Sequence, residues 1–200
     1  MTIMPALNLP LPRWFALLAL LLVMPARADL APGGITLSVG KADNFGDATN
    51  VADVQARRIG LSGPLPVPLI PDRWRGWGLE TGYVLEVGEW EWDGAGDTAA
   101  TSLDEFGLVA ALRAHPSEAT GFYLEVGTGI RLLTRSRVSG RELSTEFHFG
   151  SHGGAGIRFG PGDRLDAALM IQHLSNARIR TPNPGINFYQ LRLTYRPPSW

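Results

Sequence analysis

The chain of 200 residues contains no cysteine, which excludes disulfide bonds and metal sites built from thiolates. Charged residues make up only 18% of the sequence, and the formal net charge is −1. The basic residues are scattered, so the sequence indicates no nucleic-acid partner. Beyond the N-terminus, no apolar run reaches about 18 residues, which excludes a membrane-spanning helix but not a transmembrane β-barrel, whose strands alternate.

The N-terminus has the pattern of a cleaved secretory signal. Arg13 provides a positive charge, residues 14–24 are apolar throughout, and Pro25-Ala26-Arg27-Ala28 ends in an Ala-x-Ala cleavage pattern. The apolar run is too short to cross a bilayer comfortably as a helix. We therefore expect residues 1–28 to be a signal peptide and residues 29–200 to form one domain.

The rest of the chain alternates between apolar and polar residues, which is the period of a β-strand. The segment 121–133 shows this most clearly, with Phe122, Leu124 and Val126 opposing Tyr123, Glu125 and Gly127. Eight strands are predicted, covering about residues 34–41, 52–61, 77–90, 102–113, 121–133, 144–159, 165–175 and 187–195. The proline-rich segment 62–75 is expected to be a loop, because proline has no N–H to donate to a strand ladder.

One face of the predicted strands is almost wholly apolar, and the other carries charge. The charged face contains Glu80, Glu86, Glu125, Arg131, Glu146, His148, Arg158, Asp166 and Arg192. An all-β, eight-stranded antiparallel transmembrane β-barrel fits this pattern, with its apolar face toward lipid and its polar face toward a side-chain-filled interior. Closure also removes the unpaired strand edges that lipid would not tolerate. The alternative is a soluble, lipocalin-like barrel with an apolar interior.

Two further groups have a structural interpretation. His148 and His152 share the inward face with Glu146, where we expect an internal hydrogen-bond network and no metal site. The aromatic residues Trp77, Trp90, Trp92 and Tyr195 are expected to form girdles at the two membrane interfaces.

A histidine and a serine continue the apolar face of the seventh strand at its end. With both chain ends periplasmic, this strand ends at the outer surface, so His173 and Ser175 would face the outer-leaflet head groups. Two strand residues span about 6.5–7 Å, a distance at which an imidazole can reach a hydroxyl and activate it as a nucleophile. Asn187 has outward parity on the next strand and could orient the imidazole, and Asn183 in the connecting loop could donate to an oxyanion.

The motif His173-Leu174-Ser175-Asn176-Ala177, followed by Pro182-Asn183-Pro184-Gly185, closely resembles the lipid A deacylase family of the PagL type. Its members are eight-stranded outer-membrane barrels that remove a 3-O-linked acyl chain from lipid A, the membrane anchor of lipopolysaccharide. The resemblance implies a serine esterase without a cofactor, in which His173 is the base, Ser175 the nucleophile and Asn183 an oxyanion-hole donor. We place Asn176 and Arg178 with Asn183 in the oxyanion and substrate-binding set.

The sequence departs from the family pattern at two positions. Asn187 stands where the family has a glutamate, and Arg178 stands where a glycine often follows the alanine. Loss of the acid in serine hydrolases costs on the order of 10⁴ in rate. Three alternatives therefore stay open: a slower hydrolase, a hydrolase that recruits an acid such as Glu142 from elsewhere, and a structural barrel without activity.

Several arginines are expected in the outer loops close to this site. They are Arg135, Arg137 and Arg141 in the third loop, and Arg178 and Arg180 in the fourth. Beside lipid A, these guanidinium groups could pair with its phosphates. The sequence leaves open whether two copies associate as a homodimer.

Overall fold

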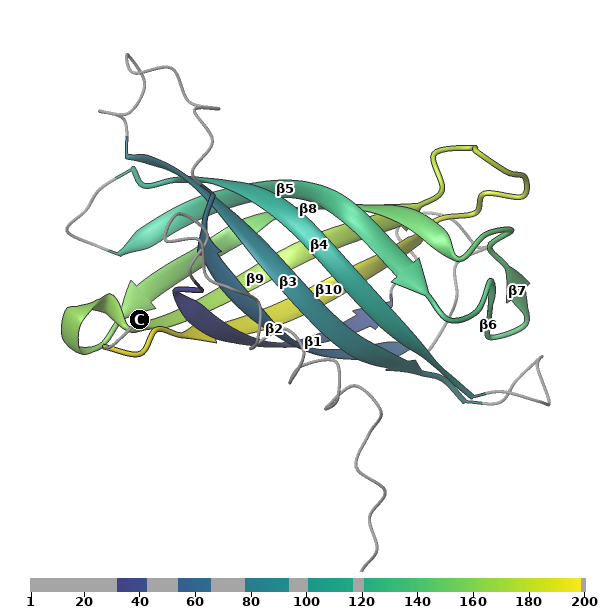
Figure 1. The fold of residues 1–200 in the computed structure, drawn as a ribbon, viewed down its shortest axis with the longest axis horizontal. Helices are drawn as coiled ribbons and strands as arrows, with labels where there is room; N and C mark the ends of the chain where they lie inside the picture. Colours follow the sequence, from purple (N-terminus) through teal and green to yellow (C-terminus); the bar gives the residue numbers. More distant parts are fainter. Residues whose placement is uncertain (1–31, 43–53, 66–77, 94–100, 117–120, 199–200) are drawn as a thin grey trace, which may run out of the picture.

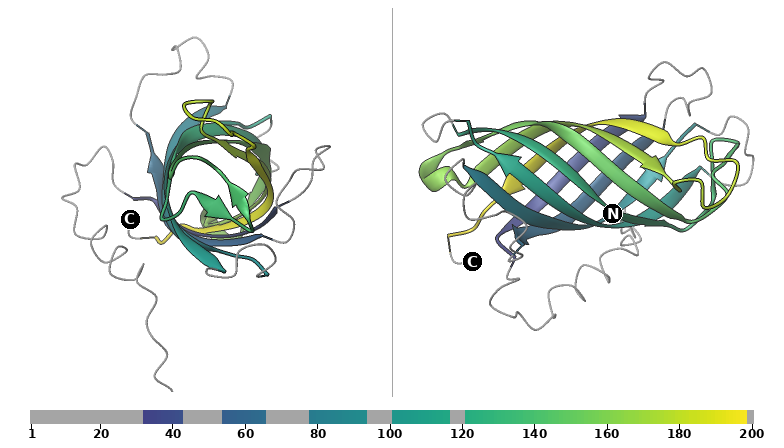
Figure 2. Two further views of the ribbon diagram at one scale, coloured as in Figure 1. Left: turned by 90° about the vertical axis from the view of Figure 1, so that its right-hand side faces the viewer. Right: turned by 90° about the horizontal axis from the view of Figure 1, so that it is seen from above.

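The computed structural model describes residues 32–42, 54–65, 78–93, 101–116 and 121–198. Eight strands close into an antiparallel barrel, in which β1 pairs with β10 and the other strands pair in chain order (Figures 1 and 2). The strands are β1 (Gly34–Ala42), β2 (Gln55–Pro64), β3 (Leu79–Glu91), β4 (Ser102–Ala114), β5 (Phe122–Leu133), β8 (Phe147–Phe159), β9 (Leu165–Ser175) and β10 (Ile186–Tyr195). The predicted eight-stranded barrel is confirmed. The predicted signal peptide and Trp77 lie outside the described residues.

Two small elements connect the longer strands. A short hairpin, β6 (Arg137–Val138) and β7 (Arg141–Glu142), lies between β5 and β8. It stands in front of the barrel mouth in the left view of Figure 2. A 3-10 turn, η3 (Pro161–Asp163), connects β8 to β9 at the other end. The described residues contain no helix that is long and apolar enough to cross a membrane.

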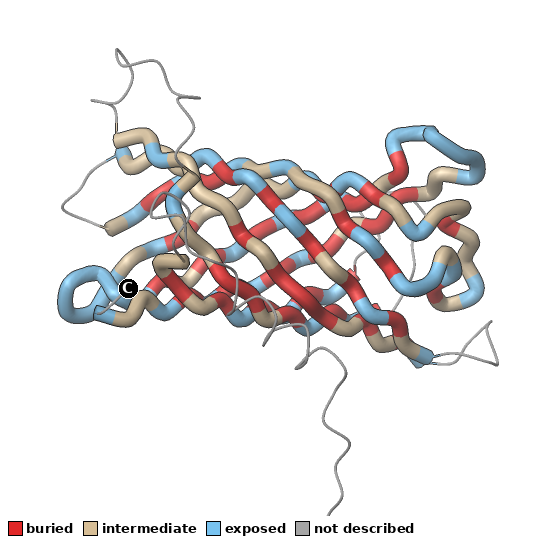
Figure 3. Tube along the Cα trace, viewed as in Figure 1, coloured by how far each residue is buried: buried red, intermediate tan, exposed pale blue. Residues whose placement is uncertain are grey.

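Buried and exposed residues alternate along the strands (Figure 3). The exposed wall is strongly apolar: Leu169 is 70% exposed, Val126 59% and Val39 54%. Apolar side chains oriented away from the interior gain free energy only when something apolar covers them. In a closed barrel, lipid supplies that cover.

The first interior ion cluster surrounds Glu105, which is buried. Its carboxylate accepts hydrogen bonds from Arg58 Nε at 2.6 Å, Trp90 Nε1 at 2.5 Å and Arg131 Nη1 at 2.7 Å. Arg131 also pairs with Glu86. Shared partners of this kind satisfy charges that would be costly to bury alone.

The second interior cluster surrounds Glu125. Both Nη atoms of Arg192 donate to it at 2.8 Å, Arg113 Nε donates at 2.6 Å, and His152 Nε2 lies 2.8 Å from Oε1. With two such clusters, the interior is charged, the reverse of the soluble barrel that we kept as an alternative.

At the outer end, the interior changes from charged to apolar. The buried residues there form what we call the outer apolar cluster: Ala42, Val54, Ala56, Trp90, Trp92, Leu103, Leu133, Val138, Leu143, Leu174, Ile186 and Phe188. Trp90 packs edge-on against Phe188, with ring centroids 4.9 Å apart. The cluster also contains Val138 and Leu143 of the hairpin segment, so the hairpin is anchored to the barrel by apolar contacts.

Two predicted girdle residues are wrongly assigned. Trp90 is fully buried and Trp92 is 5% exposed, so both belong to the interior. The inward parity of β3 and the carboxylate of Glu105, which accepts the Trp90 indole N–H, account for this placement of Trp90. Tyr195 lies on the exposed wall, at 47%.

Two local predictions also need correction. β2 extends to Pro64, although we expected a loop from Ser62; proline is tolerated there because it is the last residue of the strand. β8 begins at Phe147, although we expected this strand to start at about Ser144. Glu146, which we predicted to face inward, precedes the strand and is exposed. Glu80 has the predicted inward parity on β3, although it is solvent-exposed near the barrel end, where it accepts a hydrogen bond from Arg158 Nη1 of β8 at 3.1 Å.

Candidate active site

The predicted site residues lie on the outer ends of β9 and β10. The strand register places His173 directly opposite Asn187, and Leu174 opposite Ile186. His173 is exposed and Ser175 partly exposed on the outward wall, whereas Leu174 and Ile186 are buried in the outer apolar cluster. Because side chains alternate along a strand, His173 and Ser175 face outward, while Leu174 between them faces the interior and anchors β9 there.

The imidazole of His173 is oriented by Asn187. Nδ1 of His173 lies 2.7 Å from Oδ1 of Asn187. Because an amide oxygen only accepts, Nδ1 carries the proton in this pair. The lone pair then resides on Nε2, the tautomer that a general base requires.

Gly185 forms the surface against which the imidazole packs. A Cβ atom at this position would lie 2.8 Å from Cε1 of His173 and 3.4 Å from Nε2. The backbone φ of Gly185 is +66°, a region that glycine adopts freely. The sequence predicts only a turn at Asn183-Pro184-Gly185, because the close approach of Gly185 to His173 depends on the pairing of β9 with β10.

Two serines flank His173. Ser175 follows it by two residues on β9, and Ser151 of β8 is its direct cross-strand neighbour. Ser151 Oγ is 3.1 Å from Thr128 Oγ1 of β5. Among the described residues there is no hydrogen bond between His173 and Ser175; catalytic hydrogen bonds are often long before substrate binds. The sequence gives no sign of Ser151, because it lies outside the His173–Gly185 motif and reaches His173 only through the pairing of β8 with β9.

The loop from residue 176 to 185 connects β9 to β10 and carries Asn183. Oδ1 of Asn183 accepts the backbone N–H of Asn176 at 2.9 Å. This contact fixes which amide atom is the oxygen, and it leaves the Nδ2 hydrogens of Asn183 as donors. Asn183 can therefore donate a hydrogen bond, as the oxyanion assignment requires.

The geometry argues against Asn176 as an oxyanion or substrate ligand. Its side chain is fully buried, and Nδ2 donates to the carbonyl of Leu143 at 3.1 Å and to that of Arg180 at 3.0 Å. Its backbone N–H is occupied by Asn183. All three of its donors are used within the loops, so Asn176 positions the loop instead.

The turn after Asn176 has a backbone conformation that favours glycine. Ala177 and Arg178 have φ values of +51° and +64°, and Ile179 N donates to the carbonyl of Asn176 at 3.0 Å. Two successive positive φ values with this bond describe a type I′ turn, which favours glycine. Arg178 keeps this conformation and is exposed.

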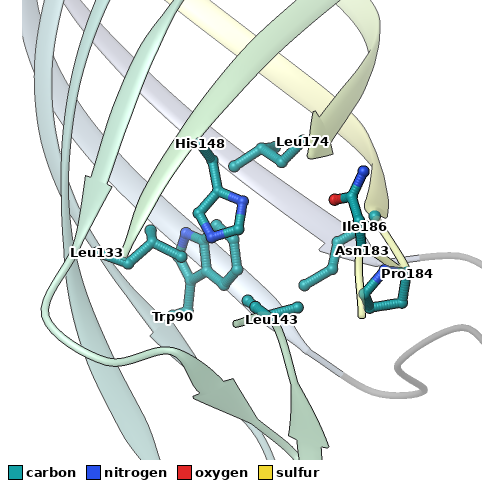
Figure 4. A pocket seen from close by; sticks show the side chains of 9 residues that line it. Trp90, Leu133, Leu143, His148, Leu174, Asn183, Pro184 and Ile186 are labelled. Atoms are coloured by element: carbon teal, nitrogen blue, oxygen red, sulfur yellow. The ribbon is translucent and has the colours of Figure 1, made fainter. Parts of the chain in front are cut away.

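Behind the site, the barrel mouth is filled. The residues there are Trp90, Leu133, Leu143, His148, Leu174, Asn183, Pro184, Gly185 and Ile186. Figure 4 shows His148, Trp90 and Leu133 on one side, with Asn183, Pro184 and Ile186 on the other. His148 Nε2 lies 2.7 Å from the carbonyl of Thr145, whereas His152 bonds to Glu125. The two histidines thus belong to separate hydrogen-bond groups.

Glu142, the nearest acid that we considered, is engaged elsewhere. Its Oε1 accepts the backbone N–H of Ser144 at 2.9 Å, and its Oε2 lies 3.7 Å from Arg137 Nε. Nδ1 of His173 already has Asn187 as its partner. The structure therefore favours Asn187 over Glu142 as the residue that orients His173.

Fold and site together define an eight-stranded barrel with a hydrolase-like group of residues on its outward wall. Comparison with known proteins narrows this class. The family model described as Lipid A 3-O-deacylase (PagL) matches residues 60–196. The chain belongs to this family.

The similar proteins agree with the family. The lipid A deacylase PagL of Bordetella bronchiseptica is 27% identical over 171 residues, covering 86% of this chain and 87% of the relative. That of Pseudomonas aeruginosa is 28% identical over 114 residues, 57% of this chain and 64% of the relative. Among solved structures, the outer membrane enzyme PagL superposes with a TM-score of 0.61 at 20% identity, covering 82% of this chain and 99% of that one. Neisserial surface protein A gives 0.51 at 11% identity, covering 82% and 94%. These two structures support the barrel fold.

Proposed function

We propose that the chain is an outer-membrane esterase that removes an ester-linked 3-O acyl chain from lipid A. Family membership supports the reaction, and the outward placement of the candidate residues supports the location. The observation that carries the proposal is the hydrogen bond between His173 and Asn187, 2.7 Å long, beside Ser175 on the lipid-facing wall. A base with its tautomer fixed, next to a hydroxyl, is the minimum for nucleophilic ester cleavage.

In the proposed mechanism, Ser175 Oγ attacks the ester carbonyl while Nε2 of His173 takes its proton. The carbonyl oxygen becomes an oxyanion, which the Nδ2 hydrogens of Asn183 stabilise. The bond from the carbonyl carbon to the sugar oxygen then breaks, and His173 returns the proton to that oxygen. Water, activated by His173, finally attacks the acyl-Ser175 ester, releasing the fatty acid and restoring the serine.

Substrate would enter sideways from the outer leaflet, because the candidate residues face the membrane. Lipid A carries anionic phosphates, and Arg178 is exposed in the loop beside the site. A guanidinium forms strong, charge-assisted hydrogen bonds with phosphate. We assign Arg178 to substrate binding on this basis. All the proposed site residues belong to one chain, and crosslinking in the membrane tests for a homodimer.

The test compares the lipid A mass spectrum of cells with and without the folded chain. We expect loss of one acyl chain with the wild-type protein and with Ser151→Ala, and no loss with Ser175→Ala. Activity that survives Ser175→Ala and disappears in Ser151→Ala would transfer the nucleophile to Ser151. An unchanged spectrum from a folded wild-type barrel would instead favour the structural, non-catalytic alternative.

A further inference from the structure

We propose that the β6–β7 hairpin positions the oxyanion donor of the catalytic site, through a hydrogen bond from Ser144 to Pro182. The proposal rests on the proposed function, because it assigns Asn183 a catalytic task. It adds a second element to the site: a loop far from β9 and β10 in the sequence that holds the 176–185 loop in its active geometry.

Two hydrogen bonds join the hairpin segment to the 176–185 loop. Ser144 Oγ donates to the carbonyl of Pro182 at 2.8 Å, and Asn176 Nδ2 donates to the carbonyl of Leu143 at 3.1 Å. They come from successive residues, 143 and 144, and reach opposite ends of the loop. The loop is therefore attached to the hairpin both where it leaves β9 and beside Asn183.

The hairpin segment is itself firmly fixed. Val138 is fully buried and Leu143 is 2% exposed, both within the outer apolar cluster. Leu143 N also donates to the carbonyl of Ser136 at 2.7 Å, which closes the hairpin. An anchored hairpin can hold a partner loop still, whereas a free loop could not.

The bond to Pro182 acts on Asn183 through the peptide plane. The carbonyl of Pro182 and the N–H of Asn183 belong to one rigid, planar peptide group. The hydrogen bond to the Pro182 carbonyl oxygen therefore fixes the backbone N–H of Asn183. The hydrogen bond from Asn176 N–H fixes the side-chain Oδ1 of Asn183. With the backbone and the Oδ1 atom of Asn183 both held, the Nδ2 hydrogens are kept in one orientation. Oxyanion stabilisation requires donors that are preorganised in this way.

Ser144 has a backbone conformation that its residue type disfavours. Its φ is +67°, in the left-handed region where glycine is normally preferred. A glycine at this position would adopt the same φ without strain, but it would lack the hydroxyl that donates to Pro182. Ser139 in the same hairpin also has a positive φ, +48°, and so offers a matched control that lies outside the contacts with the 176–185 loop.

The test is to compare Ser144→Gly with Ser139→Gly. Both changes relieve the same kind of backbone strain, so neither should make the barrel less stable. We expect Ser144→Gly to lower kcat for lipid A deacylation by about 10- to 100-fold with little change in KM, the sign of an interaction made in the transition state. Ser144→Ala should lower it equally, because it also lacks the hydroxyl. Ser139→Gly should leave both constants unchanged.

A second measurement tests the positioning without catalysis. Hydrogen exchange of the backbone amides in residues 176–185 should be faster in Ser144→Gly than in the wild type, and unchanged in Ser139→Gly. Equal exchange and equal kcat in the two glycine variants would overturn the proposal. An inactive wild type would overturn the proposed function instead, while the exchange experiment would still decide whether Ser144 holds the loop.

Discussion

Oδ1 of Asn187 lies 2.7 Å from Nδ1 of His173, at the point where the β9–β10 register sets the two residues directly opposite each other. An amide therefore occupies the place that a carboxylate has in the family pattern. It can fix the tautomer and direction of the imidazole, as the asparagine of Cys-His-Asn enzymes does. It supplies no negative charge to stabilise the imidazolium that forms when Ser175 loses its proton.

The first prediction concerns this missing charge. Asn187→Glu should not lower the deacylation rate, because a carboxylate both orients His173 and stabilises its charged form. We expect an increase on the order of tenfold or more. The measurement is the rate of acyl release from lipid A in mixed micelles, followed by mass spectrometry.

Asn187→Leu is the control for that change, since it keeps the approximate size but has no acceptor. It should reduce activity strongly by freeing the imidazole. A lower rate in the glutamate variant, with the leucine variant unaffected, would show that Asn187 is not the third member of the site.

The second prediction concerns Gly185. Gly185→Ala should reduce activity by at least about 100-fold, because its Cβ would lie 2.8 Å from Cε1 of His173 and would displace the ring. Gly160→Ala is the matched control: Gly160 also has a positive φ, +79°, but its Cβ would meet nothing closer than 3.5 Å, at Leu165. Both variants should lose some stability, because alanine disfavours a positive φ, and only Gly185→Ala should lose activity. Equal rates would separate Gly185 from the position of the imidazole.

Strand alternation was sufficient to predict the barrel and the outward direction of His173 and Ser175. The pattern has a period of two along each strand, so a residue near the strand end inherits its face from the apolar residues before it. The same rule placed Asn187 on the wall beside His173, because the eighth strand keeps its parity to Tyr195.

The sequence was less informative where contacts between distant segments decide the structure. Trp90 is of a residue type that is common in the aromatic girdles, but its indole N–H donates a hydrogen bond to Glu105 of β4 inside the barrel. The β6–β7 hairpin consists of two strands of only two residues each, too short for any periodicity to show. Asn176 looked like a ligand because of its motif, whereas its donors are used by Asn183, Leu143 and Arg180.

The third prediction concerns the interior charges. Glu105→Gln should lower the free energy of unfolding by about 3 kcal/mol or more, because it removes the negative charge shared by two buried guanidinium groups, Arg58 and Arg131, and replaces one accepting oxygen with an N–H donor. Glu91→Gln should cost less than about 1 kcal/mol, because its pair with Arg57 is largely exposed, at 45% and 62%. Urea unfolding in lipid vesicles, followed by tryptophan fluorescence, measures both. Similar losses in the two variants would contradict the interior network as a source of stability.

The fourth prediction separates the conformation of Arg178 from its charge. Arg178→Gly and Ala177→Gly keep the turn but remove the steric strain of a side chain at positive φ, at adjacent positions. This strain is roughly 1–2 kcal/mol, and the entropy of glycine offsets it in part. Both variants should therefore be as stable as the wild type or slightly more stable.

Only Arg178→Gly removes a guanidinium beside the site, so only it should raise KM for lipid A, by several-fold, with kcat little changed. The increase should shrink at high salt, where the wild-type attraction to phosphate is itself screened. A KM that rises equally in the alanine-to-glycine variant would mean that turn geometry, and not charge, determines substrate binding at this position.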